Sequence, residues 1–506
     1  MRLCQIRIVV CLTAIGTARA QLGVPADTSP GPSAAQLPLS GRTTANGAVT
    51  AVQNPAPGAT ATVNTLNPVL EVQGAYAGSV PQGVATGEVL PLTLREAIRR
   101  GIEFNLGSMG FSNAVRQARG QAIVSRSALL PNIHGNLRET LQKINLAALG
   151  VRSPLIPPVV GPFNYFDLRA TLTQALFDLT SLNNYRASKE TAAAAEYLMA
   201  DARDVIVLAV VGAYLQAVAA QSRVDAARAQ LETARALFEQ AEQQSREGLI
   251  ARVDANRSRV EMQTQEQRLI TLENDLAKQK LNLARMIGLP PGQQFMISDP
   301  MPESTVPPPT FDEALRRAFE SRGDLRAAEA QLRAAERIRA AARAERFPTL
   351  SFSADYGAIG TNPSRAGSTY TVTGNLRIPI WQGGRAAGSI DQASAALEQR
   401  RAELADIRAR IDQEIRTAFL DLESAANQIR VAESNRDVAR QNLDLTRQRF
   451  EAGVADTAEL VQAQETLATA EHDLITSAFS HGLAKAELAR AMGRAEETIV
   501  QVLGIK

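Results

Sequence analysis

The sequence predicts a mainly α-helical chain that also carries four membrane-spanning β-strands and is built as a tandem repeat. Three observations lead to this prediction: an N-terminal export signal, matching segments at a nearly constant spacing, and apolar periodicities of both strands and coiled coils. The low aromatic content (4 %) also fits, because long solvated helices use few aromatic residues.

The first twenty residues are typical of a secretory signal peptide that is cleaved before Gln21. Arg2 and Arg7 precede an apolar run over residues 8–15, and small residues follow. This run is much shorter than the about 20 residues that a membrane-spanning helix needs. We expect no later uncharged stretch of that length, so insertion into a membrane must be by strands.

We expect neither a disulfide nor a surface that attracts nucleic acid in the mature chain. Both cysteines, Cys4 and Cys11, leave with the signal, so no disulfide holds the fold. The signal also removes three arginines, which leaves 51 basic residues against 52 acidic ones. A net charge near −1 offers nucleic acid no attractive surface.

The chain repeats itself after residue 92. "LTLREAIRRGIEFN" (92–105) returns as "PTFDEALRRAFESR" (309–322), and Pro131 returns as Pro348, both at a shift of 217 residues. Later anchors keep nearly the same spacing: "LTQALFD" (172–178) with "LRIPIWQ" (376–382), Gly248 with Gly453, and Gly288 with Gly493. Anchors in one order at one spacing indicate a tandem duplication.

This duplication divides the chain into six parts. We expect a signal peptide (1–20), a mostly disordered Pro/Gly/Ala-rich tail (21–90), a first repeat (91–288), a Pro-rich linker (289–309), a second repeat (310–495) and a C-terminal tail (496–506).

Each repeat contains two segments whose alternation predicts strands with one apolar face. In "LSFSADY" (350–356), Leu, Phe, Ala and Tyr alternate with Ser, Ser and Asp. We expect strands at about 132–143 and 165–176 in the first repeat and at about 349–357 and 369–380 in the second.

Helices fill the rest of each repeat. We expect a short helix (93–104; 311–321), a longer one (106–130; 325–346), a very long one after the strands (181–246; 385–449) and another after a glycine (250–287; 455–492). The second and fourth helices together match the third in length, so they should form its antiparallel partner. The very long helix of the second repeat carries a coiled-coil seam: Leu404, Ile407, Ile411, Ile415, Phe419, Leu422, Ala426 and Ile429.

Four strands cannot span a bilayer alone, because open sheet edges leave backbone groups unpaired in hydrocarbon. Three copies would supply twelve strands, enough for a barrel with a lumen lined by the polar faces. We therefore expect a homotrimer whose 12-stranded β-barrel contacts lipid and continues into a hollow α-helical coiled-coil barrel.

Three segments carry a family resemblance: "ARAERFPTLSFSADYG", "LRIPIWQGGR" and "RFEAGVADTAELVQAQETLATAEHDL…LARAMG". They resemble the outer membrane efflux protein family, the TolC-like trimeric exit ducts of Gram-negative bacteria. The resemblance covers residues 92–495 and implies a passive conduit for small molecules. In this family a periplasmic adaptor protein and an inner membrane pump open the duct, whose periplasmic end is otherwise closed.

The glycines that interrupt the helices mark two hairpin tips, "EGLI" (247–250) and "AGVA" (452–455). A glycine that ends one helix so that another can begin explains the backbone. The resemblance adds a function, because it makes Gly248, Leu249, Gly453 and Val454 the tips that dock onto the adaptor.

The resemblance also implies a gate beside the second tip. The family's acidic ring, six and nine positions past the tip glycine, corresponds to Glu459 and Gln462, so only half of its charge is present. A solvated glutamate on a helix face is the alternative for Glu459. The family's closing latch matches at Asp254 but not at Phe450, which lacks a tyrosine hydroxyl, nor at Ala455, which replaces a basic residue.

Arg252 and Arg257 are the candidates to replace that latch. We expect one of them to pair with Asp254 or Glu459.

Other conspicuous residues predict little chemistry. Phe177 and Trp381 end strands, where an aromatic belt at the membrane interface or simple corner packing would both place them. The three histidines lack metal-ligand spacing. No nucleophile lies in a grouping with a base, so we expect neither an enzyme nor a cofactor.

Two other functions share parts of this pattern. A protein-secretion duct of the type I class has the same fold, and a periplasmic coiled-coil adaptor has similar helices. The adaptor would leave the four strands without a purpose.

Overall fold

The computed structural model describes residues 49–55, 66–150, 155–300, 309–452 and 454–504. The predicted signal peptide (1–20) and Gly453 lie outside the described residues.

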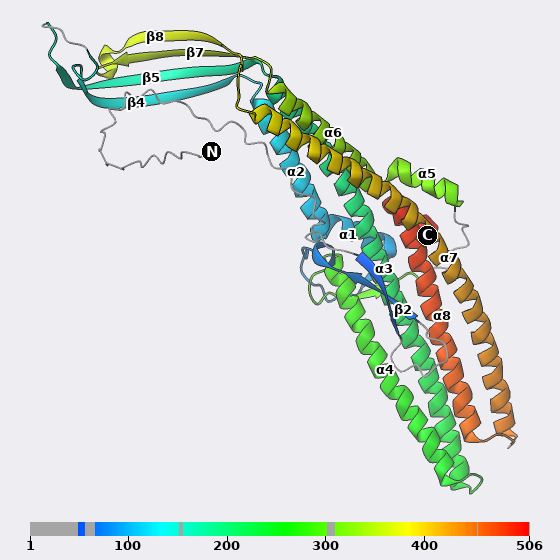
Figure 1. Cartoon of the computed structure of the whole chain (residues 1–506). Helices are drawn as coiled ribbons and strands as arrows, with labels where there is room; N and C mark the ends of the chain where they lie inside the picture. The colour runs from blue at the N-terminus through cyan, green and yellow to red at the C-terminus, as the bar shows by residue number, and fades with distance from the viewer. Residues whose placement is uncertain (1–48, 56–65, 151–154, 301–308, 453, 505–506) are drawn as a thin grey trace, which may run out of the picture. The chain divides into compact units, whose positions relative to one another are not determined.

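Both repeats fold with the same order of elements, as the duplication predicted (Figure 1). The first contains α1 (Leu94–Phe104), α2 (Leu106–Ser127), β4 (Asn132–Asn145), β5 (Val159–Phe177), α3 (Leu179–Arg246) and α4 (Arg252–Met286). The second contains α5 (Phe311–Ser321), α6 (Gly323–Ala344), β7 (Thr349–Gly360), β8 (Gly367–Arg377), α7 (Arg385–Glu451) and α8 (Thr457–Ala491). β5 begins before the predicted residue 165, and β8 ends before the predicted residue 380.

The very long helix α3 has two shorter helices as its partners, as the lengths predicted. Near its start it packs on α2, where the hydroxyl oxygens of Ser125 and Ser188 lie 2.8 Å apart. Near its end it packs on α4, where Arg228 and Glu273 form an ion pair at 2.7 Å. In the second repeat, α6 and α8 flank α7 in the same way.

Eight buried residues of α7 follow a strict seven-residue step, which indicates a left-handed coiled coil. The predicted seam is confirmed at Leu404, Ile411, Ile415 and Leu422 but is wrong at Ala426, which is exposed. Toward the tip, the buried heptad positions of α7 carry small side chains, so neighbouring helices can approach α7 closely there. The buried heptad positions are Leu397, Leu404, Ile411, Ala418, Ala425, Ala432, Ala439 and Thr446.

The apolar core centres on α3. Residues 205–222 of this helix carry no charge, contrary to our expectation that no such stretch would follow the signal. The stretch lies in a helix long and apolar enough to cross a membrane, but 72 % of the apolar window is buried inside the protein. Ile206, Tyr214 and Leu215 are each at most 1 % exposed. The window is therefore the core of the fold.

β4, β5, β7 and β8 form one antiparallel sheet in that order (Figure 1). The register places apolar residues beside apolar residues. One row across all four strands consists of Ile133, Leu172, Ala354 and Val372. Ile133 is 74 % exposed and Val372 62 %, so no residue that the structure describes covers this apolar face. The next row, on the opposite face, is His134, Thr171, Asp355 and Thr371.

Parts of three segments expected to be tails or linker are folded. In the tail (21–90), β1 (Val49–Pro55) pairs with β2 (Leu66–Val72), and Tyr76 in η2 (Gly74–Ala77) is buried. β3 (Leu90–Leu92) pairs in parallel with β6 (Phe295–Ile297), which belongs to the expected linker (289–309). The C-terminal tail (496–506) contains most of α9 (Ala495–Val502). These parts are folded because isolated apolar residues, such as Phe295 and Ile499, reach the α3 core. Residues 21–48, 56–65 and 301–308 of the expected tail and linker lie outside the described residues.

Equivalent positions in the two repeats carry different residues where the short helices α1 and α5 end. Asn105 caps α2 and donates its Nδ2 hydrogen to the Tyr76 carbonyl at 2.7 Å. Its counterpart, Arg322, is 2 % exposed and forms ion pairs with Asp324 (2.7 Å) and Glu414 (2.6 Å). Gly493, at φ +75°, packs on Arg322, and a Cβ there would lie 2.8 Å from the Arg322 Cα. The joint of the second repeat is thus a buried ion network.

Asp204 of α3 adds a buried carboxylate beside this network. It is 9 % exposed and accepts a hydrogen bond from the Glu496 backbone N–H at 3.2 Å, which fixes the start of α9. Burial raises the pKa of Asp204 to about 6, and the negative charge of Asp201 adds to this rise. The folded chain therefore binds this proton more tightly than the unfolded chain does.

We expect Asp204→Asn to raise the unfolding temperature of the detergent-solubilised protein by a few degrees at pH 8. Because the folded-state pKa is raised, the cost of the buried charge is present at pH 8 and shrinks as the pH falls through about 6. The gain should therefore shrink at pH 5. Asp225→Asn, an exposed substitution in α3, is the control. An equal gain at both pH values would contradict this account.

Candidate functional site

The first hairpin tip ends α3 with a helix-terminating hydrogen-bond pattern. The Leu249 N–H donates to the Gln244 carbonyl at 2.9 Å, and the Gly248 N–H donates to the Ser245 carbonyl at 3.2 Å. Gly248 has φ +77°, a conformation that side chains other than glycine rarely adopt. No atom lies within 4 Å of a Cβ built there, so the backbone angle and not lack of space requires glycine.

The second tip repeats this pattern 205 residues later. The Val454 N–H donates to the Arg449 carbonyl at 2.9 Å, as the Leu249 N–H does to Gln244. Asp456 then caps α8 by accepting a hydrogen bond from the Glu459 N–H at 2.8 Å. The two tips are therefore built alike, as the duplication predicted.

Both tips expose an apolar side chain directly after the glycine position. Leu249 is 70 % exposed and Val454 is 69 % exposed. Val253, in the first turn of α4, is 58 % exposed and extends the apolar surface of the first tip. Both hairpins therefore end in an exposed apolar side chain.

Glu459 forms a contact that the sequence analysis missed. Its carboxylate pairs with Arg449, across the second tip, at 3.0 Å, and the two side chains are about half exposed (49 % and 54 %). The signal was present in the sequence, because a basic last turn of α7 precedes an acidic first turn of α8. Gln462 lies exposed one turn further along α8.

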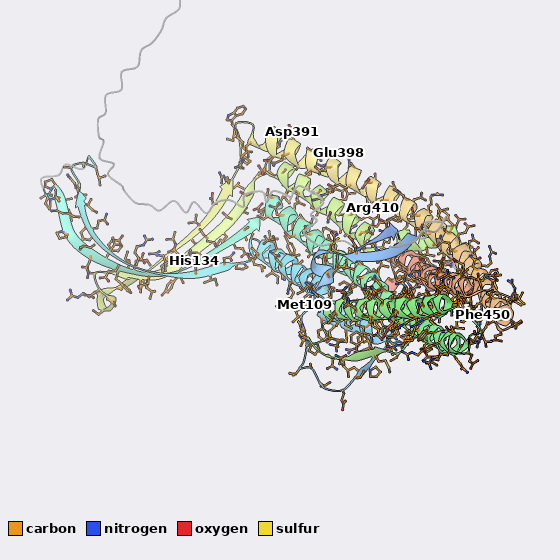
Figure 2. The ribbon with its side chains drawn as sticks, turned by 90° about the horizontal axis from the view of Figure 1, so that it is seen from below. Met109, His134, Asp391, Glu398, Arg410 and Phe450 are labelled. Atoms are coloured by element: carbon orange, nitrogen blue, oxygen red, sulfur yellow. The ribbon has the colours of Figure 1, made fainter. Side chains whose placement is uncertain are left out.

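Among the described residues, the candidate latch residues do not join different helices. Arg257 pairs with Asp254 at 3.3 Å, but both belong to α4. Arg252 forms no ion pair with any residue that the structure describes, and it lies exposed at the start of α4. Phe450 is half-buried near the end of α7 (Figure 2).

The polar face of the sheet carries a charged cluster. The Arg169 guanidinium on β5 pairs with Asp355 on β7 and with Asp167 at 3.3 Å. It also donates a hydrogen bond to Thr369 on β8 at 3.2 Å. His134 lies on β4 of the same sheet (Figure 2). This cluster lies opposite the exposed apolar face, so one face suits lipid and the other suits water.

The two aromatic candidates both lie where the sheet meets the helices. Phe177 ends β5 and is 46 % exposed, while Trp381 lies between β8 and α7 and is 87 % exposed. A side chain as large as Trp381 that is this exposed does not pack the corner of the chain. Its surface is free to contact a membrane interface.

Comparison with known proteins agrees with this architecture. The family model for the outer membrane efflux protein matches residues 112–289 and 314–494. The pyoverdine export outer membrane protein OpmQ of Pseudomonas aeruginosa is 26 % identical over 393 residues, which are 75 % of this chain and 80 % of OpmQ. Protein CyaE of Bordetella pertussis is 30 % identical over 260 residues, which are 50 % of this chain and 55 % of CyaE.

A solved structure shares the fold. The outer membrane protein VceC of Vibrio cholerae superposes with a TM-score of 0.68 at 20 % identity, covering 79 % of this chain and 96 % of VceC. This likeness confirms the predicted TolC-like fold of helices and strands. Because the family model matches most of the chain, once in each repeat, this chain belongs to the outer membrane efflux protein family.

Proposed function

We propose that three copies of this chain form the exit duct of a tripartite export system, a passive conduit for small molecules. The chain is an outer membrane protein with a large periplasmic helical part, as its family indicates. The observation that carries the proposal is the four-stranded sheet, which has an exposed apolar face, a polar face and two edges that pair on one side only. A coiled-coil adaptor would have no use for such a sheet.

A second, exposed heptad stripe on α7 supports assembly with further copies. Val431, Val438 and Leu445 lie seven residues apart and are 56 %, 62 % and 59 % exposed. Each lies directly before a residue of the buried heptad, as Val431 lies before Ala432. An apolar stripe at this spacing is the surface that a coiled coil buries against a neighbouring helix. A neighbouring copy of the chain would supply that helix.

The sheet and the tips would then have different roles in the duct. Around a three-fold axis, the face that carries Arg169 would line the lumen, and the face that carries Ile133 would contact lipid. Phe177 and Trp381 would mark the membrane interface. The two tips, with Gly248, Leu249, Gly453 and Val454, would dock onto the periplasmic adaptor, which in turn binds the inner membrane pump.

The gate would be a ring of paired charges. Three-fold symmetry would bring three Glu459 side chains around one axis, but each is balanced by its own Arg449. Gln462 adds no charge. Such a ring attracts cations less than three bare carboxylates would. Arg252, which has no ion pair within the described chain, is available to reach a neighbouring copy, while Arg257 is held by Asp254.

Cargo is proposed from the relatives. OpmQ is named for pyoverdine export, which supports an export role for this chain. In a passive conduit, the pump and the adaptor select the cargo.

Docking at the tips can be tested with cysteines, because both natural cysteines lie in the expected signal peptide. We expect Leu249→Cys and Val454→Cys, treated in living cells with a short thiol-to-amine crosslinker, to yield an adduct with the periplasmic adaptor, identified by mass spectrometry. Ile123→Cys on α2 is the matched control, because its side chain is equally exposed (69 %). Adaptor captured by the control alone, or by no variant, would contradict the docking proposal.

The gate can be tested by ion selectivity in planar bilayers. We expect Arg449→Gln to raise the permeability ratio of K⁺ to Cl⁻ by at least about twofold, because it leaves the Glu459 carboxylates unbalanced. The double variant Arg449→Gln/Glu459→Gln should return the ratio to the wild-type value. Arg447→Gln, whose arginine pairs with Glu451 in the same helix, is the control. A ratio that stays constant in all variants argues against a gate ring at Glu459.

A further inference from the structure

The polar face of the sheet carries more positive than negative side chains. Residues two apart on a strand lie on the same face, so the register assigns each paired residue to one face. Lys143 lies at an irregularity of β4, where the register assigns it to no row. Three arginines and two aspartates lie in the rows of the polar face: Arg138 on β4, Asp167 and Arg169 on β5, Asp355 on β7 and Arg377 on β8.

One arginine of this face uses both aspartates. Arg169 pairs with Asp355 and, at 3.3 Å, with Asp167. Its guanidinium also reaches past β7 to donate a hydrogen bond to the Thr369 hydroxyl on β8 at 3.2 Å. The β7 residue between them in this row is Gly357, so no side chain stands in the way. Arg169 therefore lies along the sheet, where its charge is balanced.

The other two arginines have no such partners. Arg138 is opposite Asp167 in the register, but the Asp167 carboxylate pairs with Arg169 instead. Arg138 and Arg377 are both exposed, and neither forms an ion pair with any residue that the structure describes. The positive charges of these two side chains are therefore unbalanced on the polar face.

Closure of the sheet would bring no acidic partner to them. β4 and β8 are the two edges, so a barrel would pair β4 of one copy with β8 of the next. No Asp or Glu lies on the polar face of either strand. Glu139 is the one acidic residue of these two strands, and it shares the row of Phe166 and Gly360, on the apolar face. The seam between copies would therefore carry only positive charge on its polar side.

We propose that the barrel of the exit duct favours anionic small molecules, through the unbalanced charges of Arg138 and Arg377. This inference rests on the proposed duct function, because only closure of the sheet turns its polar face into a lumen. With His134 neutral, each chain contributes one net positive charge to this face. Three-fold symmetry makes a ring of each arginine, and rings of arginine in a pore favour anions.

The two rings lie near opposite ends of the sheet. Gly367 shares the row of Arg138, and Arg377 lies ten residues further along β8. At about 3.3 Å per residue, the rings are separated by about 33 Å along the strand. An anion would therefore meet positive charge both where it enters the barrel and where it leaves.

The test measures the permeability ratio of Cl⁻ to K⁺, from the reversal potential of the full-length protein in planar bilayers between 0.01 M and 0.1 M KCl. The variant Arg449→Gln/Glu459→Gln serves as the background, because it carries no charge at the proposed gate. We expect a ratio of at least about two in this background. Adding Arg138→Gln should lower it to about one, and adding Arg377→Gln as well should lower it below one. Both arginines are exposed and without ion pairs, so these variants should fold.

Glu139→Gln is the matched control, because Glu139 neighbours Arg138 in sequence but lies on the opposite face. It should leave the ratio unchanged. The preference for Cl⁻ should also shrink in 1 M KCl, where the screening length falls to about 3 Å from about 10 Å at 0.1 M. Channels that show no preference for Cl⁻, or that keep it in both arginine variants, overturn this inference alone. A protein that forms no channels would contradict the duct function as well.

Discussion

The architecture depends on one constraint, the unpaired edges of the four-stranded sheet. β4 and β8 each pair with one neighbour only, and the row of backbone N–H and C=O groups on their outer sides needs partners wherever water is absent. The apolar face that contains Ile133 and Val372 requires a lipid environment, which is where those partners are missing. Closure with strands of other copies satisfies both requirements. The proposed lumen and the proposed gate ring would both follow from that closure.

The helical part follows a second rule, close packing by small residues at a seven-residue step. Alanines occupy the buried heptad of α7 toward the tip, at Ala425, Ala432 and Ala439. In the first hairpin, the polar side chains of Glu261 and Gln265 are buried and line a cavity between the hairpins. Apolar packing also joins the two hairpins, because Phe479 and Leu483 of α8 belong to the same core as Leu215 of α3.

Structural features that occur in both repeats were predicted from the sequence, whereas features that occur only once were not. Duplication and alternation located the helices, the four strands and both tips, because each of these features recurs at a shift close to 205 or 217 residues. β3, β6 and α9 were missed, because short apolar segments such as "FMI" have no periodicity and are held by contacts with distant α3 residues. The Arg449–Glu459 pair was missed because the family pattern directed attention to Phe450. The cavity had no signal in the sequence, since its lining combines residues from four helices.

The central claim is that copies of this chain close the sheet, and the number of copies tests it most directly. Multi-angle light scattering of the purified protein, corrected for bound detergent, measures that number. The account predicts a protein mass of about three mature chains, each with two free edges that find partners on its neighbours. A folded single chain that keeps its strands in detergent would contradict the account, because its β4 and β8 edges would then be stable without partners.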